Sequence, residues 1–92
     1  MIVRILGEGQ LRVDDSAASE LNELDARLES TVERSDESAF KPALEQLLER
    51  VRAIGRPVGP SELEPSALIL PGEGATMAEV RKLLAGDGVI PG

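Results

Sequence analysis

The sequence predicts a small α+β domain in the order ββααβα: an N-terminal β-hairpin, an αα-hairpin, a third short strand and a third helix around one small aliphatic core. Residues 1–14 alternate apolar and polar side chains on both sides of a glycine-rich turn. Residues 16–55 show two stretches of helical periodicity. Residues 66–92 contain a short apolar run followed by a third helical stretch. A chain of 92 residues suffices for one domain and not for two, so we expect a single domain over residues 1–92.

The N-terminal hairpin is predicted to have strands at residues 1–6 and 10–13, joined by Gly7-Glu8-Gly9. Glycine readily takes the positive φ angles that tight turns need. Because side chains alternate between the two faces of a strand, the aliphatic residues of both strands share one face. That face is expected to carry Val3, Ile5, Leu11 and Val13, with Arg4 and Arg12 on the opposite face.

Two amphipathic helices are predicted within residues 16–55, the first from about Ser16 to Arg34 and the second after Asp36, a candidate N-cap. Asp14-Asp15-Ser16 offers caps for the first helix. The first apolar stripe consists of Leu21, Leu24, Leu28 and Val32, and the second of Phe40, Leu44, Leu47, Leu48, Val51 and Ile54. Pro42 lies past the first turn, where proline is harmless, so we expect a late helix start or a kink. Gly55 is a natural stop.

The last part of the chain begins with a proline-rich connector at residues 56–65, in which residues 61–64 could form one capped turn. A third strand is predicted from Ser66 to Leu70. Thr76 and Glu79 match the capping-box pattern and predict the start of a third helix. This helix should turn Met77, Val80, Leu83 and Leu84 inward. The apolar tail Val89-Ile90 is either an edge strand or a packed terminal arm.

Composition argues against nucleic-acid and direct membrane binding. The chain has 17 acidic and 10 basic residues and a formal net charge of −7, whereas nucleic acids and anionic membranes attract cations. Phe40 is the one aromatic residue, too few for a base-stacking platform. No run approaches the roughly 18 apolar residues of a spanning helix, and residues 1–6 do not resemble a signal peptide. With no cysteine for disulfides, we expect a cytoplasmic protein that binds other proteins, preferably through a cationic surface of the partner.

The residue types that most enzymes use are missing. Without His and Cys, the chain lacks the common nucleophilic triads and dyads, and zinc would need carboxylates alone. A phosphate-binding loop, a dinucleotide fingerprint and a twelve-residue calcium loop are also absent from the sequence. Gly7-Glu8-Gly9 and Gly72-Glu73-Gly74 are most simply turns. We therefore expect no enzymatic activity, no catalytic residue, no cofactor and no metal site.

The first predicted helix carries an acidic strip, which we define as Asp25, Glu29 and Glu33. These residues follow one another at i, i+4 spacing along one flank of the leucine stripe, where like charges destabilise a helix by about 0.2–0.5 kcal/mol per pair. The opposite flank mixes signs, and Glu23 to Arg27 has the favourable orientation of an i, i+4 pair. The acidic strip is either a solvated face or a docking surface for a basic helix.

The whole chain resembles the PspA-associated domain family, small proteins found beside phage-shock-protein-A-like genes in actinobacteria and archaea. The resemblance rests on the segment from Met1 to Gln10 with Val13, on Leu21-Asn22-Glu23-Leu24-Asp25, on Ile69-Leu70-Pro71, and on Leu83-Leu84 with Gly88-Val89-Ile90-Pro91-Gly92. Pro42 departs from the alanine-rich helix expected of the family. The resemblance implies a cytoplasmic protein of the envelope-stress (phage-shock) response that acts with a PspA-like partner. It implies no reaction and no set of functional residues.

Two functional hypotheses follow. The first is a non-enzymatic binding module that engages a PspA-like membrane-remodelling protein, tunes its assembly and is recruited by it to the inner face of the membrane. The second is a self-associating structural scaffold without a dedicated PspA-like partner. In that case the edge of the hairpin and the apolar tail would pair between chains as a homo-oligomer.

Overall fold

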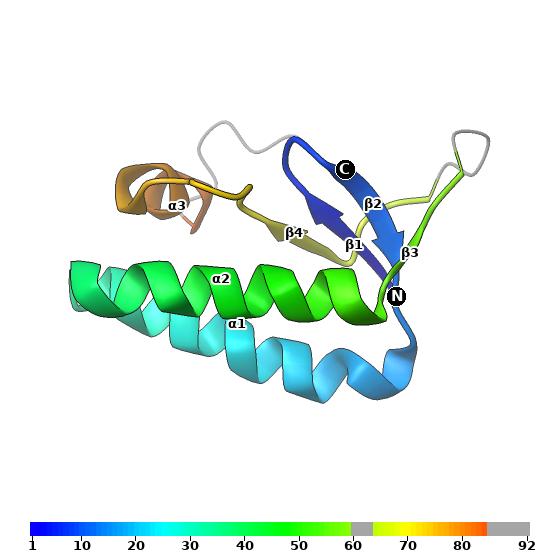
Figure 1. Ribbon diagram of the computed structural model, residues 1–92, viewed down its shortest axis with the longest axis horizontal. Coiled ribbons are helices and arrows are strands. Elements are labelled where there is room, and N and C mark those ends of the chain that lie inside the picture. Colours follow the sequence, from blue (N-terminus) through cyan, green and yellow to red (C-terminus); the bar gives the residue numbers. More distant parts are fainter. Residues whose placement is uncertain (60–63, 85–92) are drawn as a thin grey trace.

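The computed structural model describes residues 1–59 and 64–84, which form two layers (Figure 1). One layer is a four-stranded sheet in the order β3-β2-β1-β4, and the helix pair α1 and α2 covers one of its faces. Helix α3 lies beyond one end of the sheet, next to the helix pair. The elements are β1 (Ile2–Ile5), β2 (Gly9–Arg12), the 3-10 turn η1 (Asp15–Ala17), α1 (Ala18–Glu33), α2 (Glu37–Ile54), β3 (Arg56–Pro57), β4 (Leu68–Leu70) and α3 (Met77–Leu84). The α+β class is confirmed.

The hairpin has the faces that the alternation predicts. Val3 lies opposite Leu11 in the antiparallel pair of β1 and β2, and Val3 and Ile5 are fully buried against the helices. Strand β4 pairs in parallel with the other side of β1, which places Leu70 beside Ile5. The core is almost entirely aliphatic, with Phe40 as its one aromatic member. Its members are Val3, Ile5, Val13, Leu21, Leu24, Leu28, Val32, Phe40, Leu44, Leu47, Leu48, Val51, Leu70, Met77 and Val80.

The start of the segment interpreted as a connector is a strand instead. Arg56 and Pro57 form β3, which pairs antiparallel with Arg12 and Leu11 of β2. Proline is tolerated here because an edge strand leaves one side of its backbone unpaired. Since β3 covers one side of the hairpin and β4 the other, neither side of the hairpin is a free edge. Pairing of the hairpin edge between chains would therefore have to displace β3 or β4.

Helix α2 begins earlier than Pro42 led us to expect. The carboxylate of Asp36 accepts a hydrogen bond from the backbone N–H of Ala39 at 3.2 Å, and α2 starts at the next residue, Glu37. Hydrogen bonds from Ser38 and Ala39 hold the pKa of Asp36 below its usual value. Pro42 lies inside the helix and is exposed. The carbonyl that Pro42 leaves without a helical donor belongs to Ser38, also exposed, so water can satisfy it and the helix need not start late.

Gly55 ends α2, as the sequence predicts. Glycine is needed there because a larger side chain would collide with its neighbours. Its φ angle is −85°, which any residue can adopt. A Cβ atom on Gly55 would lie 2.7 Å from the carbonyl oxygen of Val51 and 3.0 Å from the Cβ of Leu11. Glycine therefore lets the end of α2 approach β2 closely enough for the chain to continue into β3.

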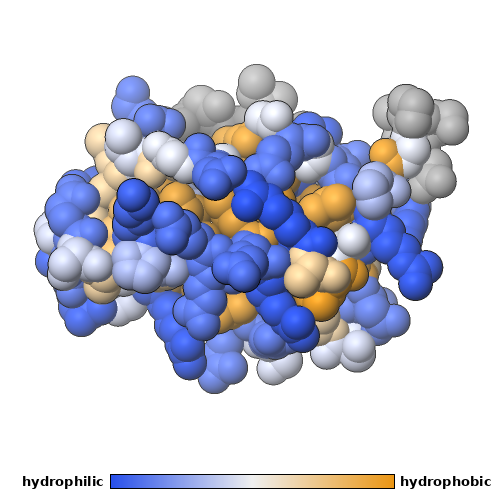
Figure 2. Space-filling model, in the orientation of Figure 1, coloured by the Kyte–Doolittle hydropathy of each residue, from blue (hydrophilic) through white to orange (hydrophobic). Residues whose placement is uncertain are grey.

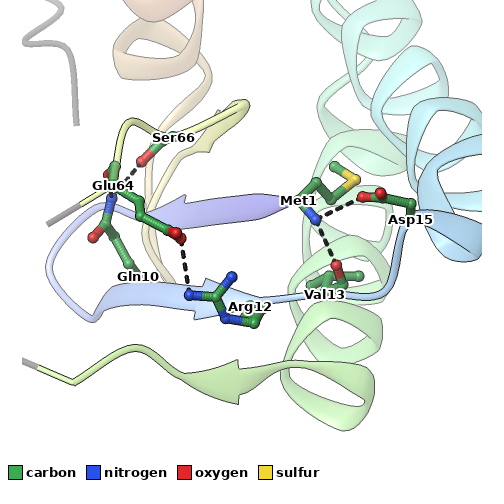
Figure 3. A network of polar contacts seen from close by, with 7 residues as sticks. All are labelled: Met1, Gln10, Arg12, Val13, Asp15, Glu64 and Ser66. Atoms are coloured by element: carbon green, nitrogen blue, oxygen red, sulfur yellow. Dashed lines mark hydrogen bonds and ion pairs between the residues drawn. The ribbon is translucent and has the colours of Figure 1, made fainter. Parts of the chain in front are cut away.

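Polar contacts fasten the chain that leads into β4 (Figure 3). The side-chain amide of Gln10 donates to the carbonyl of Glu64 at 2.8 Å and to the hydroxyl of Ser66 at 2.9 Å. The guanidinium of Arg12 pairs with the Glu64 carboxylate at 2.9 Å. These contacts tie residues 64–66 to β2, which positions β4 on the far side of β1. The predicted turn at residues 61–64 and the predicted tail strand or arm at Val89-Ile90 fall partly or wholly outside the described residues.

Candidate functional site

Helix α3 is held at the end of the helix pair by one arginine. The guanidinium of Arg81 donates to the carbonyl oxygen of Val32 at 2.9 Å and to the hydroxyl of Ser35 at 3.0 Å, at the turn between α1 and α2. A cation at the C-terminal end of α1 is favourable because the helix dipole is negative there. Met77 and Val80 are buried beneath α3. The position of α3 creates two apolar hollows, one against α1 and one against α2.

The start of α3 has the Thr76 half of the capping box that the sequence predicts. The hydroxyl of Thr76 accepts a hydrogen bond from the backbone N–H of Glu79 at 3.2 Å. The Glu79 carboxylate in turn accepts from that hydroxyl at 3.2 Å. The two side chains therefore hold the first turn of α3 in place, and with it the segment before α3 that borders both hollows.

The structure brings two residues of the acidic strip together with a cavity. Asp25 and Glu29 line a cavity of about 170 Å³ between α1, β4 and α3, which we call the acidic cavity. Its other walls are apolar and consist of Leu28, Leu68, Ile69, Pro71, Val80 and Leu83. Asp25 and Glu29 are partly buried, whereas Glu33 is exposed and lines none of the hollows found among the described residues. The sequence placed all three on one flank, but only the first two face α3.

Asp25 is partly buried and has no cationic partner among the described residues. Burial raises its pKa above the usual value, and the charge of Glu29, together with a hydrogen bond to it, raises the pKa further. Among the ion pairs of the described residues, none involves Asp25 or Glu29. A positive group beside Asp25 would favour its ionised form. The acidic cavity therefore suits a ligand with an aliphatic stem and a cationic end.

The opposite flank of α1 is neutralised from outside the helix. Glu20 pairs with Arg50 of α2 at 3.0 Å. The ion pair between Glu23 and Arg27 that the spacing favours is not formed in the described part of the chain. The negative potential of α1 is therefore concentrated on the flank that carries Asp25 and Glu29.

Sequence reasoning missed the second hollow, a groove of about 540 Å³ between α2 and residues 73–78, which we call the α2 groove. Figure 2 shows hydrophobic surface between α2 and the elements above it, bordered by hydrophilic side chains. The lining residues on α2 are Glu37, Phe40, Lys41, Leu44, Glu45 and Leu48. The helical stripe predicted these leucines as core, and no local pattern shows that residues 73–78 leave a groove beside them.

Two kinds of feature were not found among the described residues, a metal-binding cluster and a membrane-spanning helix. In residues 1–59 and 64–84, no three acidic side chains cluster closely enough to hold a metal ion. No helix in that part of the chain is long and apolar enough to cross a membrane. Of the hollows beside the short helix α3, the acidic cavity and the α2 groove both combine apolar walls with acidic residues.

Comparison with known proteins gives the family. A family model described as PspA-Associated protein matches residues 1–92, the whole chain. The chain belongs to this family. Searches among curated proteins and among solved structures found no match.

Proposed function

We propose that this chain is a non-enzymatic binding module that engages a PspA-like membrane-remodelling protein of the envelope-stress response and tunes its assembly. Membership of the PspA-associated family supports a PspA-like partner. The observation that carries the proposal is the acidic cavity, where Asp25 and Glu29 lie together without a cation beside them in the described structure. A basic side chain of the partner would relieve their repulsion, so binding and neutralisation reinforce each other.

Complementary charge of this kind acts mostly on association rate and specificity. The complex should therefore weaken as salt is raised, because dissolved ions screen the attraction between exposed charges. At physiological ionic strength the screening length is about 8 Å, and it shortens as salt is added. The apolar walls of the acidic cavity would contact the aliphatic stem of the bound side chain, and this part of the contact is insensitive to salt.

The experiment is co-purification with the PspA-like protein of the same organism, followed by titration at moderate salt. Reversal of Asp25, Glu29 and Glu33 to Lys should weaken binding at least tenfold, about 1.4 kcal/mol. Glu33→Lys alone should have a smaller effect, since Glu33 does not line the cavity. Glu23→Lys/Glu49→Lys is the control for charge reversal away from the cavity, because both residues are exposed and line neither hollow.

Two results would contradict the proposal. Absence of any complex, together with no effect on the polymer size of the PspA-like protein, would refute the function itself. Binding by the triple variant as tight as that of the control would refute the role of the acidic strip.

The proposal includes a cytoplasmic location, with the partner bringing the chain to the inner face of the membrane. A net charge of −7 supports recruitment by a partner, because anionic lipid headgroups repel a chain of this charge. Flotation with vesicles that contain anionic lipid should recover the protein only when the PspA-like protein is present. Flotation of the protein alone would contradict recruitment by a partner.

Self-association as a scaffold is the alternative, and the fold removes one route to it. The edges of the sheet are β3, which has two residues and contains proline, and β4, which has three. Short edge strands and proline discourage pairing between chains. A monomer whose mass in light scattering does not change with concentration would dismiss the alternative.

A further inference from the structure

The floor of the α2 groove is a continuous apolar ridge. Phe40, Leu44 and Leu48 follow one another at i, i+4 spacing along α2, so they lie on one face of the helix over about 12 Å. Each is at most 4% exposed and packs in the core, so a ligand would reach the ridge only through the small part of these side chains that lines the groove. An apolar floor of this length and direction fits an extended apolar segment of a ligand better than a compact polar molecule.

The opposite wall of the α2 groove is built from small residues. Gly74, Ala75 and Ala78 line it together with Met77 from the first turn of α3. Small side chains let the backbone of a ligand approach closely, and methionine adapts its shape to an irregular partner. The volume of about 540 Å³ lies within the roughly 300–1,000 Å³ of ligand-binding clefts.

The rim of the α2 groove is acidic. Glu37, Glu45 and Glu73 line it against one lysine, Lys41. Arg52 holds Glu73 at 3.4 Å while it also pairs with Glu8. Glu37 and Glu45 make no ion pair within the described residues and lie two turns apart on α2, on either side of Lys41. The rim therefore favours a ligand with positive charges near the ends of its apolar segment.

We propose that the α2 groove binds an amphipathic helix of a partner protein, whose aliphatic side chains at i and i+4 rest on the ridge of α2. Lysine or arginine side chains beside these anchors meet Glu37 and Glu45. This is the helix-in-groove mode of recognition, with the charged rim setting specificity. A second copy of this chain is a poorer occupant, because its net charge of −7 opposes an acidic rim.

The inference rests on the proposed function, in that the ligand is a protein, but it assigns a separate surface. The linings of the α2 groove and the acidic cavity share no residue. Val80 and Leu83 of α3 line the acidic cavity, whereas Met77 and Ala78 line the α2 groove. Substitutions can therefore test one surface without touching the other.

The composition of the chain supplies a probe for the α2 groove. The sequence has two methionines, and Met77 lines the groove while Met1 lies near Arg12 and Asp15 at another hollow. Protein labelled with ¹³C on the methionine methyl groups therefore gives one signal for the groove and one internal control. The titrant is a synthetic amphipathic peptide with leucines at i and i+4 and flanking lysines. A matched peptide has glutamates in place of the lysines.

We expect the lysine peptide to shift the Met77 signal with saturation while the Met1 signal stays in place. The glutamate peptide should bind at least tenfold more weakly. Ala78→Phe, which fills the groove from an exposed helix position, should weaken binding at least tenfold. Ala26→Phe is the matched control, since Ala26 is an exposed alanine of α1 that lines neither hollow.

The rim has its own pair of variants. Glu37→Lys/Glu45→Lys should weaken binding of the lysine peptide, whereas Glu23→Lys/Glu49→Lys, with the same change in net charge, should bind like the unsubstituted protein. An unmoved Met77 signal, equal binding of the two peptides, or equal binding by Ala78→Phe and Ala26→Phe would overturn the inference. A Met77 shift that follows protein concentration without peptide would overturn it in favour of a second copy.

The same variants separate the two proposals when the PspA-like protein replaces the peptide. If it binds and Ala78→Phe binds equally well, the α2 groove is not the docking surface and the proposed function stands. If it does not bind at all, the proposed function fails, and the peptide titration still decides what the α2 groove accepts.

Discussion

We expect the Asp25→Asn variant to be more stable than the unsubstituted protein at neutral pH. Asp25 is partly buried beside the acidic cavity, and Glu29 lies one turn further along α1. Burial raises the pKa of Asp25 above 3.8, and Glu29 raises it further. The folded protein therefore binds this proton more readily than the unfolded chain. Ionised Asp25 costs stability above its raised pKa, and the cost disappears as the pH falls below 3.8.

The expected gain follows from the two causes of the shift. Loss of a like-charge pair at i, i+4 spacing contributes about 0.2–0.5 kcal/mol. Desolvation is the larger cause of the shift, so the gain at pH 7 should be no smaller than this contribution. In a domain of this size, a gain of about 0.2–0.5 kcal/mol corresponds to a rise of about 1–4 °C in the midpoint of thermal unfolding. Asp and Asn have similar helix propensities, so the substitution itself adds little.

Urea denaturation followed by far-UV circular dichroism measures the difference, since the chain has no Trp or Tyr for intrinsic fluorescence. The Asp25→Asn gain should be present at pH 7 and vanish at a pH below 3.8. Glu23→Gln, an exposed change on the same helix, should show neither the gain nor its pH dependence. A destabilised Asp25→Asn variant, or a gain that persists unchanged in acid, would refute the reasoning.

Three further substitutions test what holds α3 and the loop that precedes it in place. Arg81→Met should lower the free energy of unfolding by about 1–2 kcal/mol, because the hydrogen bonds from Arg81 to the end of α1 are lost. Lys82→Met is the control, and equal stabilities of the two variants would contradict the role of Arg81. Gly72→Ala should cost about 1–3 kcal/mol, because its Cβ would lie 2.5 Å from the carbonyl oxygen of Leu6; an unchanged urea midpoint would show that the loop relaxes freely. Thr76→Ala should cost about 1 kcal/mol through loss of the cap, whereas Thr76→Ser should retain it, and hydrogen exchange of the first turn of α3 distinguishes the two.

Local patterns predicted most of the elements because local physics forms them. The alternation of Val3, Arg4 and Ile5 assigned the faces of β1 correctly, since successive side chains of a strand must point to opposite sides. The cap of α3 was predicted from Thr76 and Glu79, which lie three residues apart. The late start of α2 that Pro42 suggested was wrong, because the cost of the proline depends on whether water reaches the freed carbonyl, which the spacing of residues does not show.

For the candidate site, the sequence determined the acidic strip and the absence of histidine and cysteine, because composition and helical spacing are properties of the chain alone. Only the tertiary structure decided that β4 and α3 meet α1 beside Asp25 and Glu29 and leave Glu33 in solvent. It also decided that residues 73–78 leave a groove along α2. The physical reason is that the lining residues on facing walls lie at least 25 positions apart in the sequence, Leu48 and Glu73 being the nearest, so their meeting depends on how the whole core packs.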